Sequence, residues 1–252
     1  MFFIGIDLAW STKNGSGVSI LSGDRNNVSF VDAKILFSDN EIINYIEEYV
    51  KDNYAIITID APLIVPNKEG RRIAEKIVGS LFRKYDAGAH PANRTRLSQW
   101  TGKIRGEEIT KILEEKGFVH NPVIKKFEET KKFFEVYPHP SMIVIFKLKS
   151  ILRYKAKPKR DYEFRWREFK KYQECLKELK NLKLPPSMIN NKIKSLRGKA
   201  LKNYEDTLDA TFCAYLAYYH WTNPEKCFVL GDMKKGYIST PIFDDMKILI
   251  KK

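Results

Sequence analysis

The sequence contains little cysteine and little histidine. Its three cysteines, Cys175, Cys213 and Cys227, have no C-x-x-C spacing, so neither a disulfide framework nor a zinc ribbon is expected. Free thiols are typical of a reducing compartment, and we therefore predict a cytoplasmic protein. The four histidines are scattered along the chain without the spacing of metal ligands.

Long apolar runs, internal repeats and a glycine-rich phosphate loop are also missing from the sequence. No segment approaches the roughly eighteen apolar residues of a membrane span, so no membrane association is expected. The opening MFFIGIDLAW has no basic region and reaches Asp7 early, which argues against a signal peptide. No fixed period indicates a solenoid or a coiled coil. The 252 residues, 43% of them apolar, are enough for one domain with a sizeable core.

Acidic residues are scarce in one part of the chain. The net charge is +14, and residues 151–200 hold 16 lysines and arginines against 5 aspartates and glutamates, a net charge of +11. This imbalance favours a phosphate-rich partner, for which we predict nucleic acid. The alternative is a surface rich in charges of both signs that stabilises the protein. This alternative explains why charged residues are abundant, but it explains poorly why one segment has such an excess of basic residues.

Apolar periodicity predicts a sheet interrupted by helices. Three buried strands each end at or near an acid, and a hairpin follows the first of them. Ser38 is expected to cap the first helix, with Glu41 three residues further on. The last long helix is apolar all round and is therefore expected in the core. The predicted elements are strands Phe2–Leu8, Gly15–Leu21, Asn27–Ala33, Tyr54–Ile59 and Lys132–Tyr137, helices Asp39–Lys51 and Asn203–Trp221, and short strands Cys227–Leu230 and Tyr237–Thr240.

This order predicts an α/β sheet with a leading antiparallel hairpin. We expect one domain over residues 1–252, with insertions at about 62–131 and 151–200. The second insertion is predicted to be helix, Pro-Pro break, helix.

Five acids lie where such a sheet binds ligands. Asp7 and Asp60 end two strands, Glu135 lies near the end of a third, and Asp206 and Asp209 are three residues apart on the last helix. Clustered carboxylates suit Mg²⁺ or Mn²⁺, and two such ions support hydrolysis of phosphodiesters. Each acid alone has a simpler explanation as a turn or cap residue, except Asp209, which lies among apolar positions.

The motifs GIDLAW, IDAPL and EDTLDA resemble the ribonuclease-H-like superfamily, and their placement resembles its Holliday-junction-resolvase branch. A closer resemblance, over nearly the whole chain, is to the DUF429 family, whose members are regarded as ribonuclease-H-like nucleases. That resemblance is carried also by RRIAEKIVGSLFRKYDAGAHPANR, FFEVYPHPS, RYKAKPKR, DTLDATFCAYLA and GYISTP. It implies an α/β ribonuclease-H-like fold, a mixed central sheet flanked by helices with helical insertions.

The resemblance also implies that Asp7, Asp60, Asp206 and Asp209 are metal ligands. The resolvase branch commonly has Glu at the second of these sites, where this chain has Asp60. Because Asp reaches less far, a role for Glu135 as an additional catalytic ligand stays open.

Basic residues in the insertions are candidates for substrate binding. Guanidinium groups suit phosphate oxygens, so Arg71 and Arg94 are predicted phosphate contacts, with surface salt bridging as the alternative. Lys155, Lys157 and Arg160, interleaved with tyrosines, either track a nucleic-acid backbone or form a solvated face. Trp10 either lines the pocket or packs, and His139 is expected to pack locally.

We therefore predict a nuclease that depends on Mg²⁺ or Mn²⁺, with two ions. Asp7 would bridge them, and Asp60 and Asp209 would complete the shells with Asp206 or Glu135. Two alternatives remain open. One is a nucleic-acid-binding module without catalysis, and the other is a nucleotide-binding protein related to actin-like ATPases and sugar kinases, for which 252 residues are short.

Overall fold

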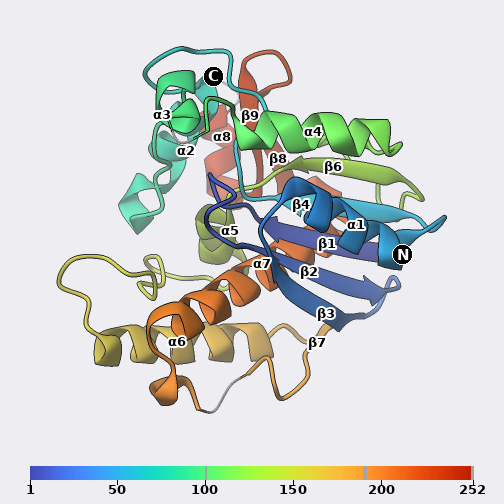
Figure 1. The fold of residues 1–252 in the computed structure, drawn as a ribbon. Coiled ribbons are helices and arrows are strands. Elements are labelled where there is room, and N and C mark those ends of the chain that lie inside the picture. Colours follow the sequence, from blue (N-terminus) through green and yellow to red (C-terminus); the bar gives the residue numbers. More distant parts are fainter. Residues whose placement is uncertain (100, 190–191, 251–252) are drawn as a thin grey trace.

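A seven-stranded mixed sheet forms the centre of the molecule (Figure 1). The computed structural model describes residues 1–99, 101–189 and 192–250. β2 runs antiparallel to both of its neighbours, and all other pairs are parallel. The strand order is β5 (Val119–His120), β6 (Lys131–Glu135), β4 (Ala55–Ile59), β1 (Phe2–Asp7), β2 (Ser16–Gly23), β3 (Val28–Leu36) and β7 (Leu182–Lys183).

Side chains of the central strands alternate between two separate cores, as the pleat requires. On β1, Phe3 packs in one cluster, whereas Ile4 and Ile6 pack in the other. Asp7 has the same parity as Phe3, so it faces the side on which Phe3 is buried.

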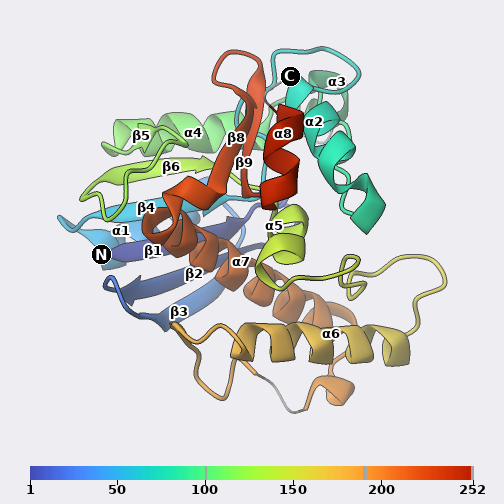
Figure 2. The ribbon, with the colours of Figure 1, turned by 180° about the vertical axis from the view of Figure 1, so that it is seen from behind.

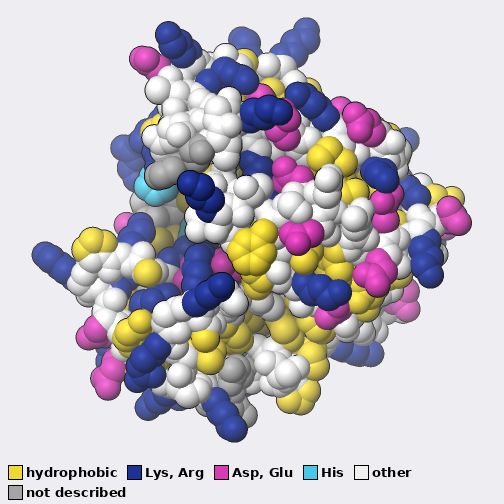
Figure 3. Space-filling model, viewed as in Figure 1, with side chains coloured by type: hydrophobic (Ala, Val, Ile, Leu, Met, Phe, Trp, Pro, Cys, Tyr) yellow, Lys and Arg dark blue, Asp and Glu magenta, His cyan; other side chains and the backbone are white. Residues whose placement is uncertain are grey.

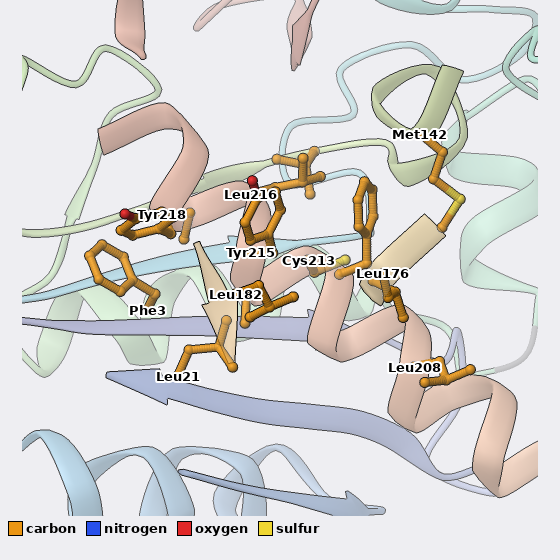
Figure 4. Close-up of a cluster of buried hydrophobic side chains, with 14 of the residues drawn as sticks. Phe3, Leu21, Met142, Leu176, Leu182, Leu208, Cys213, Tyr215, Leu216 and Tyr218 are labelled. Carbon is orange, nitrogen blue, oxygen red and sulfur yellow. The ribbon is translucent and has the colours of Figure 1, made fainter. Parts of the chain in front are cut away.

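Helix α7 (Gly198–Thr222) crosses the Phe3 face of the sheet, as Figure 2 shows from behind. Leu208 and the residues from Phe212 to Tyr218 belong to the same core cluster as Phe3 and Leu21 of the strands (Figure 4). Helices α5 (Pro138–Ile145) and α6 (Tyr162–Lys177) extend this layer. The opposite face is covered by α1 (Asp39–Val50) and α4 (Arg105–Glu115).

The remaining elements form a smaller unit beside the sheet. A two-stranded antiparallel sheet packs against α2 in its own apolar cluster. This unit includes α2 (Ile73–Phe82), the short α3 (Arg94–Ser98), β8 (Cys227–Asp232), β9 (Gly236–Pro241) and α8 (Lys247–Ile250), with 3₁₀ turns at Arg83–Tyr85, Pro224–Lys226 and Asp244–Met246. A further 3₁₀ turn, Ile193–Ser195, precedes α7.

The predicted α/β class is confirmed, and the mixed sheet flanked by helices is consistent with a ribonuclease-H-like fold. The capping box of Ser38 and Glu41 is present at the start of α1. Some bounds differ from those predicted: α7 begins at Gly198, ahead of Asn203, and residues 151–161 form a loop rather than a helix. Throughout the described part of the chain, each helix is too short or too polar to cross a membrane.

Candidate active site

Two acids meet at the carboxyl edge of neighbouring parallel strands. Asp7 ends β1, and Asp60 directly follows β4. The amide of Asp60 donates to the carbonyl of Ile6 at 2.8 Å, which fixes the two strand ends side by side. Because the parallel register pairs Ile6 with Ile59, the acids that follow have the same parity and face α7 together.

The first half of α7 brings two more acids to this edge. Asp206 and Asp209 are both buried, Asp209 to 1% exposure. Helix and sheet approach closely here, since a Cβ on Gly17 would lie 2.2 Å from the backbone oxygen of Asp206. The side chains of Asp7 and Asp206 are near enough to share a hydrogen bond.

The loop before α6 supplies two residues that hold Asp209. The Tyr154 hydroxyl donates to Asp209 Oδ1 at 2.6 Å, and the Lys155 ammonium forms an ion pair with Oδ2 at 2.8 Å. Tyr154 is fully buried and stacks on Tyr172, so it belongs to the core rather than to a nucleic-acid surface. Lys155 therefore points towards these acids, although 32% of its side chain remains exposed.

Carboxyl groups outnumber ammonium groups in this cluster. Asp7, Asp60, Asp206 and Asp209 contribute four carboxylates. Lys155 and Lys202 contribute two ammonium groups, and Lys202 also pairs with Glu205 at 3.0 Å. We call Asp7, Asp60, Asp206, Asp209, Lys155 and Lys202 the acid cluster.

The crowding of these groups shifts their proton affinities. Burial, together with the charge of neighbouring acids, raises the pKa of Asp7 and raises the pKa of Asp60 well above its usual value. Burial and Asp7 raise the pKa of Asp206 to about 7. Burial alone would lower the pKa of Lys155, but Asp209, Asp7 and Asp60 raise it well above the ordinary value, so Lys155 stays charged.

The chemistry of these residues fits a hard divalent cation, because carboxyl oxygens outnumber the ammonium groups and a bound cation would favour their ionised form. The side chains do not, however, form a ready ligand shell: among the described residues, no group of three or more His, Cys, Asp or Glu is arranged to hold a metal ion. Lys155 instead provides the positive charge nearest to Asp209.

Glu135 lies at the same sheet edge but takes part in a different network. Its register partner on β4 is Ile59, so its side chain has the opposite parity to Asp60. The Arg72 guanidinium donates to both of its oxygens, at 2.9 Å and 2.5 Å, and the Leu63 amide donates at 2.9 Å. These contacts occupy Glu135 with structural partners, and we leave it out of the proposed ligand set.

The predicted phosphate contacts fall into two groups in the structure: some bond to other residues of the chain, and others are exposed. Arg94 pairs with Glu107 at 3.0 Å and donates to the Val65 carbonyl, which is the salt-bridging alternative. Arg160 donates to the carbonyls of Arg153 and Lys155 at 3.3 Å and 3.2 Å, so it supports the loop that carries Lys155. Arg71 and Lys157 are exposed.

Two cavities open on either side of the acid cluster, and Asp7, Trp10 and Lys155 line both. The smaller has a volume of about 340 Å³ and also contains Asp60, Lys157 and His139. Burial lowers the pKa of His139 to about 3, so its ring is neutral. Its buried Nδ1 has no hydrogen-bond partner in the described chain. Figure 3 shows this face hollowed between the segments around α3 and α6.

Sequence reasoning missed three residues of this region: Arg72, Tyr154 and Lys202. Arg72 is one of two consecutive arginines, and only Glu75, three residues on, indicates which of them is buried. Lys202 lies four residues before Asp206, a spacing that could have indicated the ion pair on a helix. Nothing in the sequence signals the partner of Tyr154, which is 55 residues away.

The family model for proteins of unknown function named DUF429 matches residues 5–234. The chain belongs to the DUF429 family. The match covers the end of β1 and all of β4, β6 and α7, and therefore all four acids of the acid cluster. No curated protein matches this DUF429 member.

Proposed function

We propose that this DUF429 protein is a metal-dependent nuclease that hydrolyses phosphodiester bonds of nucleic acid with two Mg²⁺ or Mn²⁺ ions. The observation that carries the proposal is the convergence of the carboxyl groups of Asp7, Asp60, Asp206 and Asp209 in one buried cluster, where they outnumber the ammonium groups. Residues from two strands and a helix, far apart in sequence, meet there at the carboxyl edge of the sheet.

Asp7 is central in this assignment, because it adjoins Asp206 and contributes to the electrostatic environment of Asp60. Asp60 and Asp209 would complete the ligand sets on either side. The ions, when bound, would activate a water and stabilise the departing 3′-oxygen. Tyr154 holds Asp209 in one orientation, and Arg160 holds the backbone of the loop that carries Lys155.

A nucleic-acid substrate is supported by charge. The net charge of +14 favours a polyanion. In the view of Figure 3, acidic side chains gather mainly over α1 and α4, while lysine and arginine predominate on the side of α3 and α6. The hollow beside the acid cluster lies on that basic side.

A second candidate function has an observation of its own. The Lys155 ammonium already neutralises Asp209, and no ligand shell is preformed within the described residues. Both features suit a protein that binds nucleic acid through this scaffold without cleaving it.

The test compares Asp7→Asn with Asp52→Asn, a matched change at an exposed aspartate between α1 and β4, remote from the acid cluster. Single-stranded, duplex and branched DNA and RNA are incubated with Mg²⁺ or Mn²⁺, and with chelator. We expect cleavage that needs metal, falls roughly a hundredfold or more in Asp7→Asn and persists in Asp52→Asn. Wild-type cleavage by Asp7→Asn contradicts the proposal, and salt-sensitive binding without cleavage by the wild type favours the second candidate.

A further inference from the structure

The larger of the two cavities has features that the acid cluster does not account for. Its volume is about 590 Å³, which lies in the ~300–1,000 Å³ range typical of small-ligand sites. Acids of the cluster form one side of it, and the other sides carry aromatic, basic and amide groups. These are Trp10, Lys13, Asn14, Phe37, Lys199 and Asn203.

Two aromatic rings on this cavity are open to solvent. Trp10 and Phe37 are each 40% exposed. A single exposed aromatic needs no explanation, but two rings lining one cavity form a candidate stacking surface. A cation already lies over each ring: the Arg96 guanidinium is 5.3 Å from the centroid of Trp10, and the Lys199 ammonium is 5.9 Å from that of Phe37.

The cavity also carries cations without carboxylate partners. Lys13 and Lys199 are exposed, and neither forms an ion pair with any residue that the structure describes. Lys202, by contrast, is held by Glu205 and Asp206. Lys13 and Lys199 are therefore available to phosphate oxygens next to a stacked base.

We infer that this cavity binds an unpaired nucleobase of single-stranded nucleic acid, stacked on Trp10 and Phe37, with the adjoining phosphates held by Lys13 and Lys199. The inference rests on the proposed function in one respect: the scissile phosphate would lie at the acid cluster, beside the bound base. Bases in a duplex have both faces covered by their neighbours, so the site selects single-stranded or locally unpaired substrates.

Binding is measured without divalent metal, so that the result does not depend on catalysis. Tryptophan fluorescence and calorimetry follow titration of the full chain with a single-stranded oligonucleotide of roughly 10 nucleotides, its abasic counterpart and the corresponding duplex. We expect the single strand to quench fluorescence and to bind about tenfold or more tightly than either of the others.

Variants test whether single-strand binding depends on the two aromatic rings. Trp10→Ala and Phe37→Ala should each weaken single-strand binding about fivefold or more, while Trp10→Phe retains most of it because the ring is kept. Tyr54→Ala is the control, since Tyr54 is 47% exposed and lies before the opposite end of β4. Thermal unfolding verifies that each variant is folded.

Three outcomes overturn the inference: equal affinity for the abasic and the normal strand, tighter binding of the duplex, or unchanged binding by folded Trp10→Ala and Phe37→Ala. Each leaves the proposed nuclease activity intact. Conversely, stacking that depends on Trp10 in a protein that never cleaves would support this inference and contradict the nuclease proposal.

Discussion

Lys155 compensates the charge of the acid cluster when no metal is bound. Its ammonium is the closest positive charge to Asp209, and it also acts on Asp7 and Asp60. Without this internal cation, three carboxylates would be left with weak compensation, which is costly in a partly desolvated site.

Replacing Lys155 should make the protein more dependent on metal. We expect Lys155→Met to lower the free energy of unfolding in chelator by about 1–3 kcal/mol, because a partner of a buried carboxylate is removed while part of the lysine was exposed. Added Mn²⁺ should then raise the melting temperature more in Lys155→Met than in the wild type. Lys157→Met, at an exposed neighbour, serves as the control. An identical Mn²⁺ response in all three proteins would refute this role of Lys155.

Asp206 makes a pH-dependent contribution to stability. Its pKa is raised to about 7 in the folded state, above the usual value of 3.8. The folded state therefore binds a proton more tightly than the unfolded state does. As a result, the contribution of Asp206 is most favourable below about pH 4 and is lost as the pH rises towards 7.

Asp206→Asn should remove this dependence. Relative to the wild type, the metal-free variant should gain stability as the pH rises from 4 to 7, on the order of 1 kcal/mol per pH unit. Urea unfolding in chelator across this pH range measures the difference in the free energy of unfolding between the two proteins. The contributions of the buried histidines cancel in this difference, because both proteins contain them. Parallel curves for the two proteins would show that Asp206 titrates normally.

At the scale of single residues, the acids of the site could be predicted from the sequence more readily than the residues that contact them. Asp7 and Asp60 follow apolar strands, and Asp209 lies among apolar residues, so each was visible locally. Glu135 looked equivalent, but strand register gives its side chain the opposite parity to Asp60. Register is a property of the sheet, which explains why the contact with Arg72 could not be predicted.

At the scale of elements, the site depends on how closely α7 approaches β1. A Cβ on Gly5 would lie 2.0 Å from the Ala210 carbonyl oxygen and 2.1 Å from the Ala214 amide nitrogen. Any side chain there must push the helix away from the strand, and the acids of α7 would move with it.

We expect Gly5→Ala to lower the free energy of unfolding by about 3 kcal/mol or more, because backbone atoms rather than flexible side chains occupy the space. Gly88→Ala is the matched control, since a Cβ there meets nothing within 4 Å. Urea denaturation compares both with the wild type. A Gly5→Ala protein as stable as Gly88→Ala would mean that the helix lies further from the sheet than described.

The long elements were predictable, and the short ones were not. The strands and helices with strong periodicity, such as β1, β4 and α7, agree with prediction to within a few residues. The edge strands β5 and β7 have two residues each and exist only through pairing with a neighbour. Strands β8 and β9, which were predicted as short strands, pair with each other as a separate two-stranded sheet beside α2.

At the scale of the whole molecule, the net charge of +14 sets the strength of any interaction with a polyanion. We expect the logarithm of the nucleic-acid affinity to fall linearly with the logarithm of salt concentration, because counterions are released on binding. Lys13→Gln and Lys199→Gln should each reduce the slope by about 1, while Lys234→Gln, in the turn between β8 and β9, should leave it unchanged. Affinity that does not respond to salt would contradict a backbone-binding role.

The most direct test of the proposed metal site is anomalous diffraction from crystals soaked in Mn²⁺. We predict anomalous density within coordination distance of Asp7, shared with Asp60 or Asp209, together with displacement of the Lys155 ammonium from Asp209. The contradictory result is a crystal without a peak near these carboxylates at millimolar Mn²⁺, with Lys155 still paired to Asp209. That outcome would leave a basic α/β protein whose acids serve only its structure.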